Sequence, residues 1–363
     1  MKARRSAGVV ALVATVGLVG AVTAASPAVA RKTKPATTVT KGLDGPFGLQ
    51  AVGDRGFVVA ESVSGEVTRV YKDGRQRPII RGAAGVAGVA AGHGKLFSVL
   101  GGGSEEGAAP AGRYKGTSVL RSDHRGRHVK VLANLERYEL RHNPDGQVQF
   151  VKGVPVDALS NPFSMNLSKY GLLVADGGAN DVLKVNPRTG RVSTFFVPPT
   201  VKDVKACLRP GAQANPGTRG CDPVPTGIAV AQGSVYVSTL GAEVPGAGRV
   251  YRLDGRTGEV QRVWKGLTAP TGIAVTPWGT IYVSEVLYGA PAGAPPPGFK
   301  PSQIGRLTKL SHGTRTHAKV TMPTGLEFSN GHLYASTWSI AAFPPLGIQH
   351  AGRIVKVRWS AFR

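Results

Sequence analysis

The sequence predicts an all-β protein, a six-bladed β-propeller with about four antiparallel strands in each blade. Three observations predict it. A Pro-x-Gly-(Ile/Leu) motif recurs along the chain, an apolar strand follows each copy after a short turn, and a strand that alternates apolar and polar residues comes next. The unit repeats at about 40 to 50 residues, which is typical of propellers. Because a lone four-stranded sheet cannot bury both of its faces, we expect such units to pack in a ring.

Each unit begins with a strand that carries the motif or a weaker copy of it. The clear copies are 46–49, 225–228, 270–273 and 323–326, and the weaker ones are 86–89 and 162–165. The second strands predicted from apolar runs are 57–60, 96–99, 172–175, 235–238, 281–284 and 333–336. The alternating third strands are 67–70, 118–121, 182–185, 250–253, 307–310 and 354–357.

The last unit ends at its third strand, whereas residues 37–43 precede the first unit and have the pattern of a spare strand. We expect this N-terminal strand to pair as the outer strand of the sixth blade and to close the ring. Closure removes an exposed sheet edge, which would otherwise invite aggregation.

Residues 1–30 predict a signal peptide. Three of the first five residues are basic, the run 8–22 carries no charge, and a small-x-small pattern ends at Ala30. The uncharged run is shorter than the roughly 20 residues that span a bilayer. We therefore expect cleavage after Ala30, a secreted chain without a membrane span, and one monomeric propeller domain over residues 31–363.

Cys207 and Cys221 are the only cysteines in the chain. An even count in an oxidising compartment predicts a disulfide between them. In the chain-entropy model, closing a loop of this length contributes about 3 kcal/mol.

The net charge of the chain is +24, and the loss of three basic residues with the signal peptide leaves +21. Such a charge favours anionic partners. An anionic cell-wall polymer or an extracellular protein suits a secreted chain, whereas 7% aromatic residues and no recognition helix argue against nucleic acid. A compositional bias that serves solubility is the alternative. The candidate residues lie in or beside the turns between third and fourth strands: Arg75, Arg77, Arg125, Arg127, Arg188, Arg191, Arg256 and Arg262.

The loops on the two faces of the predicted ring differ in length. Because successive strands are antiparallel, the turns after strands one and three share one face, the short-turn face. The loops after strand two and between blades share the other, the long-loop face. The long insertions fall there: 101–116, 133–161, 198–224, 241–248, 287–305 and 340–351. Functional residues concentrate on loops that a rigid scaffold holds, so we expect the ligand on this face. Loops that merely cover the ring are the alternative.

The last residue of the second strand alternates in chemistry around the ring. Alternate blades place a carboxylate there, from Glu61, Asp176 and Glu285, while two of the other blades offer Thr239 and Thr337. Three carboxylates near the channel mouth could hold Ca²⁺, which takes oxygen ligands. They could equally order loops by accepting backbone N–H bonds. No other cofactor is predicted.

The chain contains no His-x-x-His spacing, no Gly-x-Ser-x-Gly elbow and no phosphate-binding loop, so no catalytic residue is predicted. The sequence alone does not decide whether the chain is an enzyme, and it favours a protein without catalytic activity. We expect a non-catalytic binding module whose long-loop face meets a wall polymer, a carbohydrate or a protein.

The motif strands followed by Tyr-Val-Ser and an acidic residue resemble the NHL-like and gluconolactonase-like six-bladed propellers. A narrower resemblance lies in the second insertion. There Leu135, Tyr138-Glu139 and Asn143-Pro144-Asp145-Gly146 precede Asp157 and Asn161-Pro162. This run is similar to the ScyD/ScyE family of exported propellers, which is named after a scytonemin pigment cluster, and the resemblance covers roughly residues 36–358. It implies the fold and export, and an accessory role in secondary-metabolite assembly as an alternative function.

The gluconolactonase-like enzymes hold a divalent metal at the channel with acidic and Asn ligands, one of them in a Pro-Asn-Gly motif. The matching positions in this sequence are Thr226, Thr271 and Thr324, and none is Asn. The resemblance also implies a metal-dependent, lactonase-like hydrolase as an alternative function, ahead of the accessory role.

Overall fold

The computed structural model describes residues 34–102, 112–156, 159–210, 212, 215–293 and 295–363 of the chain. The predicted signal peptide with its cleavage site after Ala30 lies outside the described residues, and so does Asp157 of the family-like run.

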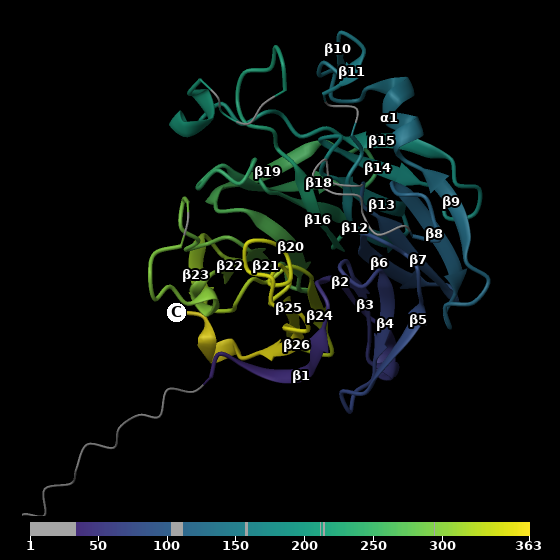
Figure 1. Ribbon diagram of the computed structural model, residues 1–363, viewed down its shortest axis with the longest axis vertical. Coiled ribbons are helices and arrows are strands. Elements are labelled where there is room, and N and C mark those ends of the chain that lie inside the picture. Colours follow the sequence, from purple (N-terminus) through teal and green to yellow (C-terminus); the bar gives the residue numbers. More distant parts are fainter. Residues whose placement is uncertain (1–33, 103–111, 157–158, 211, 213–214, 294) are drawn as a thin grey trace, which may run out of the picture. The chain divides into compact units, whose positions relative to one another are not determined.

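Six four-stranded antiparallel sheets form in the described chain, and they follow one another as the blades of a propeller (Figure 1). Blade one consists of β2 (Pro46–Ala51), β3 (Phe57–Glu61), β4 (Glu66–Val70) and β5 (Gln76–Ile80). Blade two consists of β6 (Val86–Gly92), β7 (Lys95–Leu100), β8 (Ser118–Asp123) and β9 (Lys130–Asn134). Blade three consists of β12 (Pro162–Ser168), β13 (Gly171–Asp176), β14 (Asp181–Val185) and β15 (Val192–Phe196).

The second half of the ring repeats this order. Blade four consists of β16 (Pro225–Ala231), β17 (Ser234–Thr239), β18 (Gly248–Asp254) and β19 (Val260–Leu267). Blade five consists of β20 (Pro270–Val275), β21 (Ile281–Glu285), β22 (Arg306–Ser311) and β23 (Thr314–Ala318). Blade six consists of β24 (Leu326–Ser329), β25 (His332–Thr337), β26 (Gly352–Val357) and β1 (Ala36–Leu43). The predicted fold class is confirmed.

Closure of the ring is also confirmed. Strand β1 pairs with β26 as the outer strand of blade six, with Thr37 opposite Lys356 and Thr40 opposite Ile354. The first and last strands of the propeller thus share one sheet, so that no blade is left with three strands.

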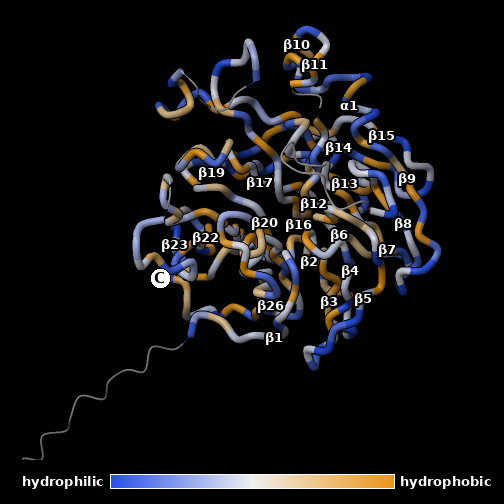
Figure 2. Tube along the Cα trace, viewed as in Figure 1, coloured by the Kyte–Doolittle hydropathy of each residue, from blue (hydrophilic) through white to orange (hydrophobic). Residues whose placement is uncertain are grey.

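The hydrophobic core lies between successive blades, where Figure 2 shows apolar residues along the strands. Each of six clusters joins two neighbouring sheets; Val99 of blade two and Leu183 of blade three, both fully buried, belong to one of them. The glycine of the repeated motif is required where inner strands approach one another. A side chain at Gly272 would collide with the backbone oxygen of Thr324 in the next blade.

The insertion between β9 and β12 carries further elements, the helix α1 (Glu136–His142) and the two-stranded sheet of β10 (Phe150–Val151) and β11 (Val154–Pro155) (Figure 1). The described residues also contain four short 3-10 helices outside the sheets, at Gly53–Arg55, Lys205–Leu208, Pro301–Gln303 and Trp359–Ala361. No helix in the described part of the chain is long and apolar enough to cross a membrane.

Cys207 and Cys221 form the predicted disulfide, with their Cα atoms 4.9 Å apart. The bond joins the 3-10 helix Lys205–Leu208 to the loop that leads into blade four. Both cysteines pack with Val201 and Ala247 in a small cluster that is separate from the cores between the blades.

Candidate functional site

Glu285, at the end of β21, is fully buried and forms an ion pair. The Nε–H and Nη2–H groups of Arg306 donate to its two oxygens at 2.7 and 3.1 Å. The backbone N–H of Thr268 donates at 2.7 Å, and the hydroxyl of Thr308 donates as well. Groups of blade five and of the loop before it therefore satisfy the hydrogen-bonding capacity of both oxygens of this carboxylate.

Asp176, at the end of β13, is also fully buried, but only neutral groups donate to it. These are the hydroxyl of Ser160 at 2.5 Å and the backbone N–H groups of Asn161 and Ala179 at 2.7 and 3.3 Å. Burial raises the pKa of Asp176 to about 6 because these bonds only partly offset the loss of water.

Glu61, at the end of β3, accepts the N–H of Asp44 at 2.7 Å, and burial raises its pKa. The three predicted carboxylates therefore share one structural use. Each accepts the N–H of a residue that lies just before the first strand of its own blade. This arrangement ties the loop that leads into a blade to the end of the second strand.

The structure does not bring these three carboxylates together as a shared cation site. In the described part of the chain, no three His, Cys, Asp or Glu side chains gather closely enough to hold a metal ion by themselves. Thr239 is fully buried and its hydroxyl lacks a hydrogen-bond partner among the described residues, whereas the hydroxyl of Thr337 donates to the backbone oxygen of Arg353 at 3.4 Å.

The threonines of the motif do not fit a lactonase-type metal at the channel. Each hydroxyl donates to the backbone oxygen of the motif proline in the next blade. The distances are 2.8 Å from Thr226 to Pro270, 3.1 Å from Thr271 to Pro323 and 2.9 Å from Thr324 to Pro46. These hydroxyl groups hold neighbouring blades together.

An apolar cavity lies on the long-loop face at the mouth of the channel. The ring of Phe47 stacks on that of Phe163 at 5.1 Å between centroids, and it lies 5.8 Å from that of Phe343. The cavity has a volume of about 470 Å³, and its wall also includes Leu287 and Phe299. The sequence reasoning did not predict this site. Its signal was present, because Phe47 and Phe163 occupy the variable position of the motif in blades one and three.

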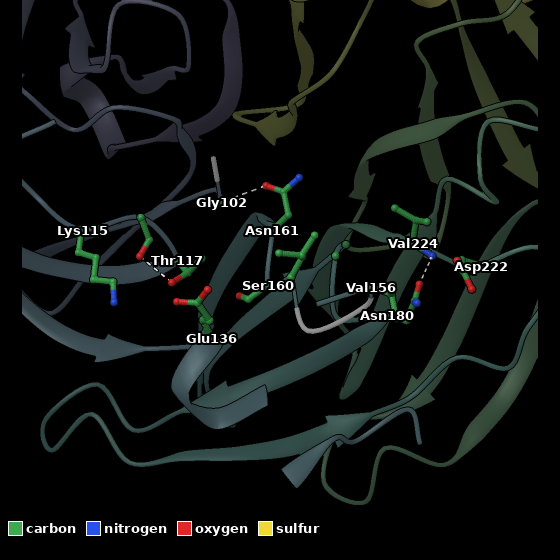
Figure 3. Close-up of a pocket in the computed structure, with 14 residues that line it drawn as sticks. Gly102, Lys115, Thr117, Glu136, Val156, Ser160, Asn161, Asn180, Asp222 and Val224 are labelled. Carbon is green, nitrogen blue, oxygen red and sulfur yellow. Dashed lines mark hydrogen bonds between the residues drawn. The ribbon is translucent and has the colours of Figure 1, made fainter. Parts of the chain in front are cut away.

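A polar cavity of about 580 Å³ adjoins the apolar one, since Gly102 and Asn161 line both. Figure 3 shows Asn161 in the middle of its wall, with Lys115 and Glu136 on one side and Asp222 on the other. The N–H of Gly102 donates to Oδ1 of Asn161 at 3.1 Å, which leaves the Nδ2 group of the amide as a donor for a ligand. The two cavities together suit a molecule with one apolar and one polar end.

On the short-turn face, some of the predicted arginines line a hollow of about 360 Å³ between blades one and two. We call it the basic groove; its charged lining is Arg55, Arg69, Arg77, Arg125 and Arg127. Arg69 donates to the backbone oxygen of His124 at 2.6 Å, and burial lowers its pKa.

The other predicted arginines do not join the basic groove. Arg75 forms an exposed ion pair with Asp73 at 2.6 Å. Arg262 lies over the ring of Trp264, 4.7 Å from its centroid. The remaining ones, Arg188, Arg191 and Arg256, lie in or beside the turns of blades three and four.

Comparison with protein families and with curated proteins gives no match to this sequence. Solved structures share the fold at low identity. A gluconolactonase from Xanthomonas campestris is 12% identical, with 88% of this chain and 89% of that chain covered and a TM-score of 0.53. A Bacteroides thetaiotaomicron protein of unknown function is 13% identical, with coverages of 89% and 76% and a TM-score of 0.55. A luciferin-regenerating enzyme is 9% identical, with coverages of 89% and 94% and a TM-score of 0.53. The chain is thus a six-bladed β-propeller structurally like gluconolactonases.

Proposed function

We propose that the chain is an exported, non-catalytic binding propeller whose long-loop face takes a small molecule with an apolar, ring-bearing end and a polar end. The apolar cavity of Phe47, Phe163 and Phe343 carries the proposal. Its volume lies within the range of small-molecule sites, and aromatic side chains with a few polar groups are their usual lining. The polar end of the ligand would face Asn161 and the polar cavity beyond it.

Two further features support the proposed export and the proposed class of ligand. The disulfide is typical of an oxidising compartment, as expected for a chain cleaved after Ala30 and secreted. A ligand with an apolar ring also agrees with the resemblance to the ScyD/ScyE propellers, whose name refers to a pigment cluster. We therefore infer membership of that family and an accessory role in handling a secondary metabolite as the more specific form of the proposal.

The proposal is tested with N-phenylnaphthylamine, a neutral aromatic probe whose fluorescence rises in apolar surroundings. The net charge of the protein does not attract it. We expect saturable binding to the mature chain and a several-fold loss of affinity in Phe343→Gln. The ring of Phe343 is 37% exposed and would be covered by the probe, and burying a fully exposed Phe side chain is worth about 1.5 to 3 kcal/mol. The control is Trp278→Gln, which removes a 61% exposed ring from a short turn and leaves binding unchanged.

Unsaturable binding, or equal losses in Phe343→Gln and Trp278→Gln, would contradict a site at the channel mouth. The lactonase alternative is assayed on the same protein with a sugar lactone and added Ca²⁺ or Mn²⁺. Because Thr226, Thr271 and Thr324 are committed to the neighbouring blades, we expect hydrolysis at the rate of the buffer alone.

The basic groove favours a second candidate function, binding of an anionic wall polymer. Polyphosphate is a suitable probe. We expect its affinity to fall steeply with salt, since exposed charges are screened beyond about 10 Å at 0.1 M ionic strength. The pair Arg77→Gln and Arg127→Gln should weaken binding, and Arg256→Gln, in a turn of blade four, serves as the matched control. Affinity that does not depend on salt would leave only the compositional explanation for the charge.

A further inference from the structure

A cluster of acidic side chains lies beneath helix α1 on the long-loop face. Leu135 precedes Glu139 by one helical turn, so both lie on the same side of the helix. Leu135 is fully buried against Leu183 of β14. This packing places Glu139 over the ends of β13 and β14, where Asp176 and Asp181 pair in register.

Several oxygens in this cluster are buried without a partner. Asp181 is 0% exposed and Glu139 is 1% exposed. Both carboxylate oxygens of Asp181, Oε2 of Glu139 and Oδ1 of Asn143 meet no hydrogen-bond donor among the described residues. A buried polar oxygen that is left unpaired is strongly unfavourable, and a buried unpaired carboxylate is more so.

The neighbouring charged groups add repulsion to the cost of burying these oxygens without partners. The charged groups that act on Asp181 are Asp176, Glu139 and Asp145, all of them acids. Burial, followed by these carboxylates, raises the pKa of Asp181 well above its usual range, and burial raises that of Glu139 to about 7. The chain contains 45 Lys and Arg against 21 Asp and Glu, yet none of the ion pairs found among the described residues reaches Asp181 or Glu139.

We propose that this cluster is a binding site for a hard divalent cation, Ca²⁺, with Asp181 and Glu139 as charged ligands and Oδ1 of Asn143 as a neutral one. Ca²⁺ takes six to eight oxygens from carboxylates, amides, backbone carbonyls and water, in irregular geometry. The acids do not gather closely enough to hold a metal by themselves, so neutral oxygens complete the coordination. The site uses neither Glu61 nor Glu285.

The cation would hold the insertion that follows β9 against blade three. Next to the site, Nδ2 of Asn180 donates to Asp145 at 3.3 Å, and Nε2 of Gln147 donates to Asp222 at 3.1 Å. Asn180 and Asp222 also line the polar cavity. Calcium therefore has a structural role with a consequence for binding, because it fixes one wall of that cavity.

Terbium is the direct probe, since it replaces Ca²⁺ and emits when an adjacent aromatic ring is excited. Tyr138 is next to Glu139 in the chain. We expect Tyr-sensitised emission from the mature protein at about one ion per chain, displaced by Ca²⁺ and not by Mg²⁺ at equal concentration. We also expect millimolar Ca²⁺ to raise the Tm by about 3 °C or more, because a ligand that binds only the folded state stabilises it.

The variants Asp181→Asn and Glu139→Gln should each weaken terbium and calcium binding by at least about tenfold, since each removes one charged ligand. The matched control is Glu327→Gln, which removes an acid of raised pKa from blade six and should bind both ions like the wild type. If Asp181→Asn does not fold, Glu139→Gln and the metal content of the wild type decide the question.

Three results would overturn the site. One is terbium emission that Ca²⁺ does not displace. Another is an equal loss of binding in Glu327→Gln and Asp181→Asn. The third is a calcium-dependent Tm that survives in Asp181→Asn and disappears in Glu285→Gln, which would place the cation in blade five. None of these readouts depends on the small-molecule ligand, so the site and the proposed function fail independently.

Discussion

Blades three and five bury an acid at the same point of the repeat and neutralise it differently. In blade five, Glu285 pairs in register with Arg306, and the guanidinium forms two hydrogen bonds with the carboxylate. In blade three, Asp176 pairs in register with Asp181, a second acid that is equally buried. Blade five thus supplies a basic side chain as the counter-ion of its acid. In blade three, neutral groups donate to Asp176, and the oxygens of Asp181 have no hydrogen-bond partner among the described residues.

The difference teaches that the repeat specifies backbone position and leaves charge compensation to each blade. Blade one is intermediate. Glu61 pairs in register with Glu66, but Glu66 reaches the exposed Arg81 at 3.1 Å. An alignment of the repeats would treat the last residue of the second strand as one site in all three blades. Its partner at the start of the third strand differs in each blade: Arg306 neutralises Glu285, Glu66 pairs with the exposed Arg81, and Asp181 binds, as we propose, a cation.

The largest effect is expected from breaking the pair in blade five. Glu285→Gln leaves Arg306, whose side chain is only 15% exposed, without its carboxylate. Loss of one partner of a buried ion pair costs about 3 kcal/mol or more, so we expect the free energy of unfolding in urea at neutral pH to fall by that amount. The matched change in blade three, Asp176→Asn, leaves no basic group without its partner, so the free energy of unfolding should fall by less. Equal losses in the two variants would remove the distinction between the blades.

An intermediate effect is expected from Glu327 on β24, a half-buried acid with no acidic neighbour. It accepts a hydrogen bond from Nε2 of Gln50 at 3.1 Å, and burial raises its pKa to about 8. The folded state holds this proton more tightly than the unfolded state, where the pKa is about 4.3. Glu327 therefore stabilises the protein fully below about pH 4, and this contribution is lost as the pH rises toward 8.

Glu327→Gln cannot ionise, so the variant should lose less stability than the wild type between pH 5 and pH 9. At the upper pH we expect the variant to be more stable by about 1 to 2 kcal/mol, less than the full shift implies because the side chain is partly exposed. Urea unfolding at each pH measures it. Parallel pH profiles for the two proteins would show that the carboxyl is not held neutral by the fold.

Much of the fold was predictable because each repeat contains the same local signals for strands and turns. An alternating strand and a turn recur in each blade, and the motif glycine recurs in every blade except blade three, which has Ser164. The spare strand before blade one could pair only where blade six lacked one. The insertion between β9 and β12 was assigned only as a loop. Its helix α1 is short and its strands β10 and β11 hold two residues each, so no periodic pattern could develop in the sequence.

The sequence predicted which residues end the second strands, but it predicted neither their hydrogen-bond partners nor the aromatic cavity. The sequence placed Glu61, Asp176 and Glu285 correctly at strand ends, yet their partners depend on backbone N–H groups in the loops, which carry no residue signature. The unpaired Asp181 could not be recognised without knowing that it is buried. Likewise, the aromatic cavity combines Phe47 and Phe163 with Phe343 from a distant loop, and only the closed ring brings them together.

The smallest effect is expected in blade one, and it completes the comparison. Glu66→Gln removes the ion pair with Arg81, whose side chain is 73% exposed, and such surface pairs contribute between 0 and about 1 kcal/mol. The same change relieves the repulsion that Glu66 exerts on Glu61, a lesser cause of its raised pKa after burial. The two effects oppose each other, so we expect the free energy of unfolding to change by less than about 0.5 kcal/mol. A loss comparable with that of Glu285→Gln would mean that charge pairing across strands two and three is a requirement of the repeat itself, and blade three could then not tolerate Asp181 without a cation.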